Sequence, residues 1–112
     1  METNTALKSL SALSHESRLA AFRALVQAGP EGLAVGELRD RLDIPAATLS
    51  AHLNILRTAA LVHDQREGRV IRVRANYLQM NGLIDYLTQN CCGGITACAP
   101  SQPCTPKKKA SR

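Results

Sequence analysis

The sequence predicts one small domain of the α+β class, mainly α-helical with a single β-hairpin. Apolar residues recur at helical spacing in several stretches between residues 7 and 90, which predicts a set of amphipathic helices. Among them, residues 71–74 alternate apolar and basic side chains shortly after a glycine, a pattern typical of a strand that follows a tight turn. A chain of 112 residues can bury only a modest core, so we expect it to associate with a partner chain.

Two helices open the chain. Leu7, Leu10 and Leu13 recur at helical spacing and predict the first helix. Ser14 follows as the expected N-cap of the second helix, because a serine side chain can accept a hydrogen bond from a free backbone N–H of the first turn. The Gly-Pro pair at 29–30 should end this second helix. Its apolar positions are Leu19, Phe22, Leu25 and Val26.

A short turn joins the third and fourth helices, which makes the pair a helix-turn-helix. Val35, Leu38 and Leu42 mark the third helix. Residues 43–45 then make a tight break, in which Pro45 suits the first turn of the next helix, where a missing N–H costs nothing. The apolar side of the fourth helix comprises Leu49, Leu53, Leu56 and Ala60. The residues turned outward or sideways are Ala47, Ser50, Ala51, Asn54 and Thr58.

A basic hairpin follows the helix-turn-helix. Residues 61–66 and 69–74 are expected to form its two strands around a turn at residues 67–68. Arg72 and Arg74 alternate with apolar residues there, and they either face a nucleic acid or form an ordinary solvated strand surface. A hairpin in this position is a wing, so the expected architecture is a winged helix-turn-helix.

One more helix completes the expected domain. Asn76 can cap it, and the glycine pair at 93–94 should stop it near Cys91. Its apolar stripe consists of Met80, Leu83, Ile84 and Leu87. We therefore divide the chain into a domain at residues 1–92 and a flexible, basic, cysteine-containing tail at residues 93–112.

The net charge is +5 at pH 7, but Lys107, Lys108, Lys109 and Arg112 supply most of it. The distribution is more informative than the total, because residues 57–74 carry five arginines and only two acidic residues. Such a segment predicts one basic face, as nucleic-acid-binding proteins have. The chain contains no apolar run near the roughly 20 residues of a membrane span and no secretory signal at its start, so we expect a cytoplasmic protein without membrane contact.

The four cysteines, Cys91, Cys92, Cys98 and Cys104, lie within fourteen residues. In a reducing cytosol this clustering points to metal ligands or redox groups and not to a disulfide framework. Soft thiolates select thiophilic ions, and the glycines after Cys92 leave enough slack for the thiol of Cys98 to fold back over the vicinal pair. Cys104 is either a fourth ligand of a tetrahedral zinc or cadmium site or a bystander, and we favour the bystander.

Three stretches occur in order along the chain as a recognisable set. They are residues 13–19 (Leu-Ser-His-Glu-Ser-Arg-Leu), residues 48–57 (Thr-Leu-Ser-Ala-His-Leu-Asn-Ile-Leu-Arg), and Leu61-Val62 followed by residues 66–69 (Arg-Glu-Gly-Arg). Together they resemble the ArsR/SmtB family of metal-responsive winged-helix repressors, over residues 7–90. The resemblance implies a homodimer that covers double-stranded operator DNA and leaves it when a metal or metalloid binds. It also implies that the last helix packs with the first across a two-fold axis.

The chain departs from that family at two sensor positions. Residues 34–38 contain no thiol, where arsenic-sensing members often carry cysteines in the third helix. The last helix contains Asp85 as its only acidic residue and no histidine, where zinc-sensing members place their ligands. By elimination the effector site falls on Cys91, Cys92 and Cys98, which also resemble the C-terminal thiols of one arsenite-sensing branch. We therefore expect arsenite or antimonite as effector, with As(III) or Sb(III) on three sulfurs.

Other interpretations of the same thiols stay open: they could oxidise in a redox sensor, or bind zinc or cadmium in a regulator. An enzyme is not expected, because the sequence shows neither a Cys-His-acid constellation nor a phosphate-type anion loop. The histidines, His15, His52 and His63, are scattered along the chain. No catalytic cofactor is expected.

The resemblance also assigns DNA contacts and a dimer interface. With the fourth helix in the major groove, small and polar side chains approach base edges or phosphates while arginines lie against the backbone. Arg66 and Arg69, which flank the wing turn, could reach either a minor groove or a phosphate. The expected DNA-binding residues are Ala47, Thr48, Ser50, Asn54, Arg57, Arg66 and Arg69. Family members often carry Gln-Ser where this chain has Ala46-Ala47, so we expect fewer hydrogen bonds to bases. The expected dimer interface comprises Leu7, Leu10, Leu83, Ile84 and Leu87, of which the last three fit either the core or the interface.

Overall fold

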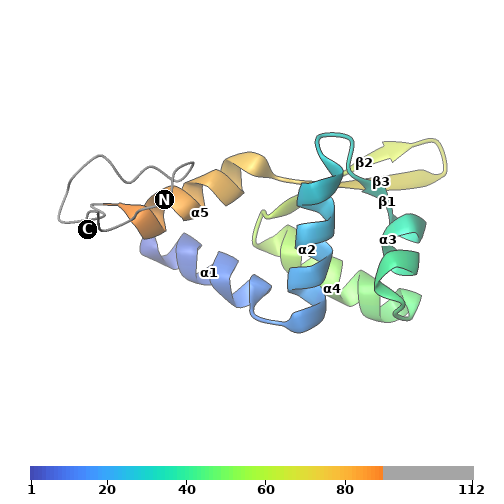
Figure 1. The fold of residues 1–112 in the computed structure, drawn as a ribbon, viewed down its shortest axis with the longest axis horizontal. Coiled ribbons are helices and arrows are strands. Elements are labelled where there is room, and N and C mark those ends of the chain that lie inside the picture. Colours follow the sequence, from blue (N-terminus) through green and yellow to red (C-terminus); the bar gives the residue numbers. More distant parts are fainter. Residues whose placement is uncertain (90–112) are drawn as a thin grey trace, which may run out of the picture.

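The structure of the protein, a computed structural model, describes residues 1–89 (Figure 1). Its elements in chain order are α1 (Thr3–Leu13), α2 (Glu16–Ala28), β1 (Leu33–Ala34), α3 (Val35–Leu42), α4 (Ala46–Thr58), β2 (Val62–Glu67), β3 (Val70–Ala75) and α5 (Tyr77–Thr88). The expected helices and hairpin are all present in this part of the chain, so the predicted winged helix-turn-helix fold is confirmed.

A short strand that the sequence did not predict, β1, forms one edge of the sheet. The strand order is β1-β3-β2 and both pairings are antiparallel, with Leu33 opposite Val73 and Val62 opposite Ala75. Gly32 precedes β1 at φ +68°, and a Cβ there would collide with the carbonyl oxygen of Val73. Glycine is therefore required for β1 to approach β3 so closely.

Leucines from the three central helices form the middle of the core. As expected from their spacing, the leucines of α2, α3 and α4 that point inward are almost completely buried: Leu25, Leu38, Leu49, Leu53 and Leu56. The remaining members of the cluster are Ala12, Ala21, Phe22, Leu33, Ala59, Leu61, Val62, Val73 and Ala75. The expectation for Leu19 is wrong, because this side chain is 44% exposed on the outer side of α2.

The start of α2 lies one residue later than expected. Ser14 follows the last turn of α1, and His15 is the N-cap of α2, with its Nδ1 accepting a hydrogen bond from the backbone N–H of Ser17 at 3.1 Å. An imidazole acceptor replaces the predicted hydroxyl in satisfying a free N–H of the first turn. Arg18, one residue further on, donates from Nε to the carbonyl oxygen of Ala12 and so holds α1 against α2.

The ends of α4 also differ slightly from the prediction. Pro45 is the N-cap and not a residue of the first turn. The helix ends at Thr58, and Ala60 lies beyond it with φ +63°. Ala59 therefore joins the core in place of Ala60, which is exposed.

The hairpin and the start of the last helix follow the prediction to within a residue, whereas the last helix ends three residues before the expected position near Cys91. The turn comprises Gly68 and Arg69, one residue later than expected, and φ +63° at Gly68 suits a two-residue type II′ turn. Asn76 caps α5 as predicted, its Oδ1 accepting from the N–H of Gln79 at 3.4 Å. The helix ends at Thr88, and the glycine pair at 93–94 and the proposed domain boundary at residue 92 lie outside the described residues.

Helices α1 and α5 lie side by side at the end of the molecule opposite the hairpin turn (Figure 1). A hydrogen bond of 2.7 Å joins Thr3 Oγ1 and Tyr86 Oη, and Gln79 Nε2 donates to the buried Ser9 Oγ at 3.3 Å. Sequence positions 3 and 86 are thus brought together on one surface. In residues 1–89 no helix is long and apolar enough to cross a membrane.

Candidate nucleic-acid interface

The helix-turn-helix is built from α3 and α4. Glu37 Oε1 accepts a hydrogen bond from the N–H of Ala34 at 2.9 Å, which satisfies a backbone donor at the start of α3. At the other end of α3, Asp43 adopts a left-handed conformation with φ +53° and reverses the chain before Pro45. Asparagine and aspartate tolerate this conformation better than other non-glycine residues. The turn between the two helices therefore has a local cause in the sequence.

The two faces of α4 divide as the sequence predicts. Leu49, Leu53 and Leu56 are buried in the core, whereas the four small or polar residues predicted to approach DNA from this helix are exposed. Those four are Ala47, Thr48, Ser50 and Asn54. Their exposure is what contact with DNA requires, and the contacts themselves stay a prediction.

Arg57 occupies a position that the sequence did not reveal. Its Nη1 donates to Asn54 Oδ1 at 2.7 Å, and its Nε lies 2.9 Å from Oδ2 of Asp64 on β2. The second contact is an ion pair without hydrogen-bond alignment, since the Nε–H does not point at an acceptor. Both charged side chains are about one-third exposed, at 30% and 33%. The guanidinium thus links the last turn of α4 to the wing, and its expected contact with the DNA backbone stays a prediction.

The arginines of the wing fall into two groups. Arg66 and Arg69, near and in the hairpin turn, are exposed, as a role in DNA binding requires. Arg72 instead pairs with Glu67 on the adjacent strand, Nε to Oε1 at 3.3 Å, and Arg74 is half-buried. The alternative that the latter two simply form part of the strand surface is the one that these contacts favour.

Two histidines from distant parts of the sequence meet beside α4. The ring centroids of His15 and His52 are 4.6 Å apart, and the Nδ1 of His52 is buried without a hydrogen-bond partner in the described residues. Burial lowers the pKa of His52 below its usual range, and the nearby His15 and Arg18 lower this pKa further. No local pattern in the sequence predicts this pair, since 37 positions separate its members.

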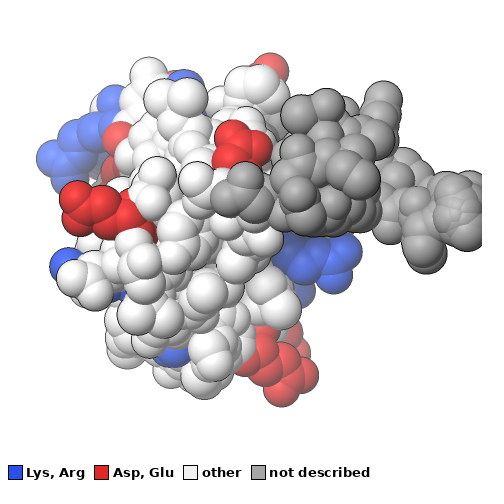
Figure 2. Space-filling model, turned by 90° about the vertical axis from the view of Figure 1, so that its left-hand side faces the viewer, with Lys and Arg blue, Asp and Glu red and all other residues white. Residues whose placement is uncertain are grey.

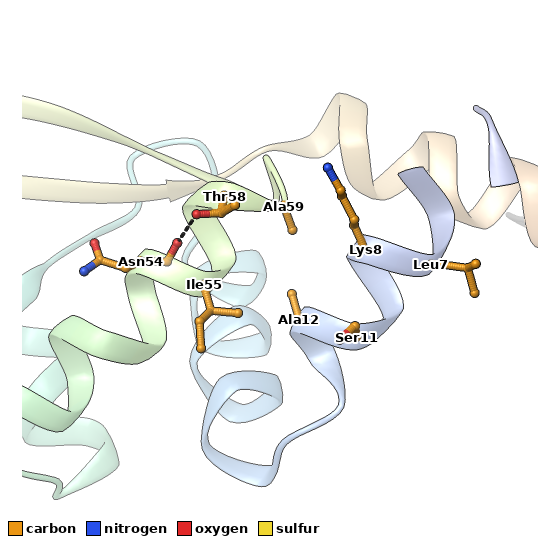
Figure 3. Close-up of a pocket in the computed structure, with 8 residues that line it drawn as sticks. All are labelled: Leu7, Lys8, Ser11, Ala12, Asn54, Ile55, Thr58 and Ala59. Carbon is orange, nitrogen blue, oxygen red and sulfur yellow. Dashed lines mark hydrogen bonds between the residues drawn. The ribbon is translucent and has the colours of Figure 1, made fainter. Parts of the chain in front are cut away.

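A groove of about 500 Å³ lies between α1 and α4 (Figure 3). Ala12 and Ala59 are among its lining residues, together with Leu7 of α1 and Ile55 of α4. Its other lining residues are Lys8, Ser11, Asn54 and Thr58. The hydroxyl of Thr58 donates to the backbone carbonyl of Asn54 at 2.9 Å, which leaves a largely apolar surface.

The residues expected at a dimer interface are divided between surface and interior. Leu7 and Leu10 of α1 and Leu87 of α5 are exposed, at 57%, 40% and 58%. Leu83 is buried within the protomer and Ile84 is half-buried. Outside the grey atoms, Figure 2 shows that the middle of this end of the molecule is largely uncharged, with charged side chains mainly towards its edges.

The cysteines predicted to bind an effector, Cys91, Cys92 and Cys98, lie outside the described residues, as does Cys104. Within residues 1–89 no group of three or more His, Cys, Asp or Glu side chains is arranged to hold a metal ion. The metal-site prediction therefore stays a prediction that depends on the sequence.

Comparison with known proteins places this architecture in a family. Residues 13–65 match the model of a helix-turn-helix domain, and no curated protein sequence matches the chain. Among solved structures, an ArsR-like transcriptional regulator from Rhodococcus sp. RHA1 is 28% identical, with a TM-score of 0.68, over 77% of this chain and 78% of that one. HlyU from Vibrio cholerae, also solved in a reduced form, is 30% identical, with a TM-score of 0.61, over 82% of this chain and 99% of HlyU.

The transcriptional repressor BigR from Xylella fastidiosa is 30% identical, with a TM-score of 0.62, over 80% of this chain and 88% of BigR. These matches cover most of this chain and most of each relative's length. They agree with the motifs at residues 13–19 and 48–57 and with the order of elements in the fold. The chain belongs to the ArsR/SmtB family of DNA-binding transcriptional regulators.

Proposed function

We propose that this regulator is a repressor that binds operator DNA as a homodimer and leaves it when arsenite or antimonite binds Cys91, Cys92 and Cys98. The observation that carries the DNA-binding part is the division of α4 into a buried leucine face and an exposed face, next to a wing with exposed Arg66 and Arg69. A helix with one anchored face and one free face can enter the major groove without unfolding the core.

The dimer is supported by the end of the molecule that α1 and α5 form. Three leucines of these helices are exposed: Leu7, Leu10 and Leu87. A small domain that exposes several large apolar side chains gains stability by covering them. A two-fold axis through this end would present two copies of α4 to two half-sites of DNA.

The effector assignment is supported by the chemistry of the thiols and by the position of α5. Trivalent arsenic and antimony prefer soft sulfur ligands, and a vicinal pair with a third thiol nearby in sequence supplies three. The first of these cysteines follows the end of α5 by three residues. A ligand bound there would act on DNA through α5 and the dimer, and the coupling must be reciprocal, with DNA weakening arsenite binding by the same factor.

The decisive experiment measures binding to a DNA site by fluorescence anisotropy, under reducing conditions, with and without arsenite. The site would first be selected from a random pool by the wild-type protein. We expect each of Cys91→Ser, Cys92→Ser and Cys98→Ser to bind DNA as wild type does but to resist release by arsenite. Cys104→Ser is the matched control and should still be released. Release of the Cys98→Ser variant, or resistance of Cys104→Ser alone, would show that the ligand set is wrong.

A second candidate is a thiol-based redox regulator that uses the same cysteines. It is favoured by the similarity to HlyU, a relative that has been solved in a reduced form. The same assay separates the two: release by a mild oxidant, reversed by reductant and independent of arsenite, would support the redox regulator. Release by zinc or cadmium at low concentration, lost in Cys104→Ser, would instead support a four-thiolate metal site.

A further inference from the structure

The first two turns of α4 present an exposed surface made mainly of methyl groups. Five exposed side chains lie there, and three of them are alanines: Ala46, Ala47, Thr48, Ser50 and Ala51. The N-terminal residues of the second helix are the ones that reach base edges in a helix-turn-helix. None of the five has the length or the paired donor and acceptor groups that make bidentate contacts with guanine or adenine.

The next outward residue of the helix is already engaged within the protein. Asn54 Oδ1 accepts from Arg57 Nη1 at 2.7 Å, which uses one of the two lone pairs of this oxygen and orients the amide towards the guanidinium. Arg57, the nearest residue able to make a bidentate contact with guanine, is paired with Asp64. Residues able to make bidentate contacts with bases are thus either missing from the exposed face of α4 or already engaged in contacts within the protein.

We propose that α4 selects its DNA site chiefly by apolar contact between alanine methyl groups and the 5-methyl groups of thymine. Thymine is the only base that presents a methyl group in the major groove, so apolar side chains of this size can distinguish it from cytosine. Thr48 adds a further methyl, and the hydroxyls of Thr48 and Ser50 accept or donate without strong preference among bases. The sites preferred by this protein should therefore carry thymines opposite the start of α4.

This inference depends on the proposed function, because it assumes that α4 enters the major groove. Beyond that function, the inference names the chemical group on the DNA that the protein recognises. The free wing arginines supply charge but no base selection if they contact phosphates, so discrimination falls to the α4 face. Removal of one contacted methyl should weaken binding roughly fourfold, the factor that corresponds to one buried methylene-sized group.

The test uses the full-length, reduced protein and a site selected from a random DNA pool. Each thymine of that site is replaced singly by deoxyuridine, which lacks only the 5-methyl group, and binding is measured by fluorescence anisotropy. We expect losses of roughly fourfold at a few thymines and none at thymines in the flanks. Ala47→Ser and Ala51→Ser should each make the protein insensitive to uridine at one of those positions, which separates a direct contact from a change in DNA shape.

The outcomes distinguish this inference from the function on which it depends. If no sequence is enriched and binding is equal for all DNA, the operator-binding function itself is wrong. If a sequence is enriched but uridine leaves its affinity unchanged at every position, the proposed function stands and thymine-methyl recognition is wrong. Uridine effects that persist unchanged in both serine variants also contradict the inference, since the methyl groups would then act through DNA shape.

Discussion

The ring of His52 lies against the ring of His15, and its Nδ1 is buried without a hydrogen-bond partner in residues 1–89. A proton on His52 would place a positive charge in a partly desolvated position near His15 and Arg18. The folded protein therefore keeps this imidazole neutral at a pH at which the unfolded chain already binds the proton.

The first prediction is that His52 makes the folded protein less stable in mild acid. Because the pKa of His52 is lowered on folding, the unfolded state binds more protons, and the free energy of unfolding falls as pH drops below the unfolded value of about 6.5. In thermal unfolding between about pH 7.5 and about pH 5.5, His52→Gln should lose less stability than wild type. His63→Gln, which removes an exposed histidine of β2, is the control and should lose as much as wild type. Equal pH dependence in all three proteins would contradict the prediction.

At the scale of elements, the ion pair between α4 and the wing is the contact most relevant to DNA binding. Arg57 and Asp64 are only seven residues apart, but they lie on a helix and on a strand, so neither periodic pattern predicts the pairing. A partly exposed pair of this kind contributes at most about 1 kcal/mol to stability. We expect a larger effect on DNA binding, because the pair neutralises a guanidinium at the end of α4.

The second prediction is that Asp64→Asn strengthens DNA binding. Without the carboxylate, Arg57 is free to approach a phosphate, and the slope of log affinity against log salt should become steeper by roughly one unit. Stability should fall by no more than about 1 kcal/mol. Asp85→Asn on α5 makes the same chemical change away from α4 and the wing, and should alter neither quantity. A weaker binding of Asp64→Asn with an unchanged slope would mean that the ion pair instead holds Arg57 in place for its contact.

The third prediction concerns the wing turn. Replacing both Arg66 and Arg69 by Ala should weaken DNA binding and flatten the salt dependence by roughly one unit for each lost phosphate contact. The double replacement by Lys keeps the charges and should keep the slope, which separates electrostatics from side-chain shape. A slope unaffected by the alanine variant would exclude the wing from the DNA interface.

The elements could be predicted from sequence wherever a periodic pattern extends over several turns. Leu49, Leu53 and Leu56 predict the inner face of α4, and the alternation in residues 71–74 predicts β3. The two-residue strand β1 was missed because it is too short to show a period, and its cause, the approach allowed by Gly32, is a tertiary contact. The cap of α2 was assigned to Ser14 because hydroxyls are common caps, whereas the structure uses the ring of His15.

For the candidate site, the exposure of the side chains can be predicted from the sequence, but their contacts with other side chains cannot. The outward face of α4 followed from its helical period, so Ala47, Thr48, Ser50 and Asn54 were found correctly on the surface. The partners of Arg57 and His52 come from β2 and from the start of α2. Such contacts depend on how elements pack, which a single sequence does not encode in a local pattern.

At the scale of the whole molecule, the position of Leu83 changes how a dimer should be tested. The sequence suggested this residue for the interface, but it is only 6% exposed within the protomer. An aspartate there would bury an unpaired carboxylate and destabilise the fold itself, so loss of a dimer would be ambiguous. Exposed leucines of α1 and α5 give cleaner variants, because their replacement removes surface contacts and leaves the core intact.

The last prediction is that Leu7→Asp and Leu87→Asp each convert a dimer into folded monomers. Both side chains are more than half exposed in the protomer, so a charge there costs little in the monomer but is desolvated and unpaired in a two-fold interface, where it occurs twice. Sedimentation velocity at micromolar concentration should show a wild-type dimer and monomeric variants with unchanged circular dichroism. Leu19→Asp, at an exposed leucine of α2, is the matched control and should remain dimeric. The monomers should also bind an inverted-repeat site more weakly, because each half-site must then be bound independently. A monomeric wild type that nevertheless binds such a site tightly would rule out the two-fold arrangement.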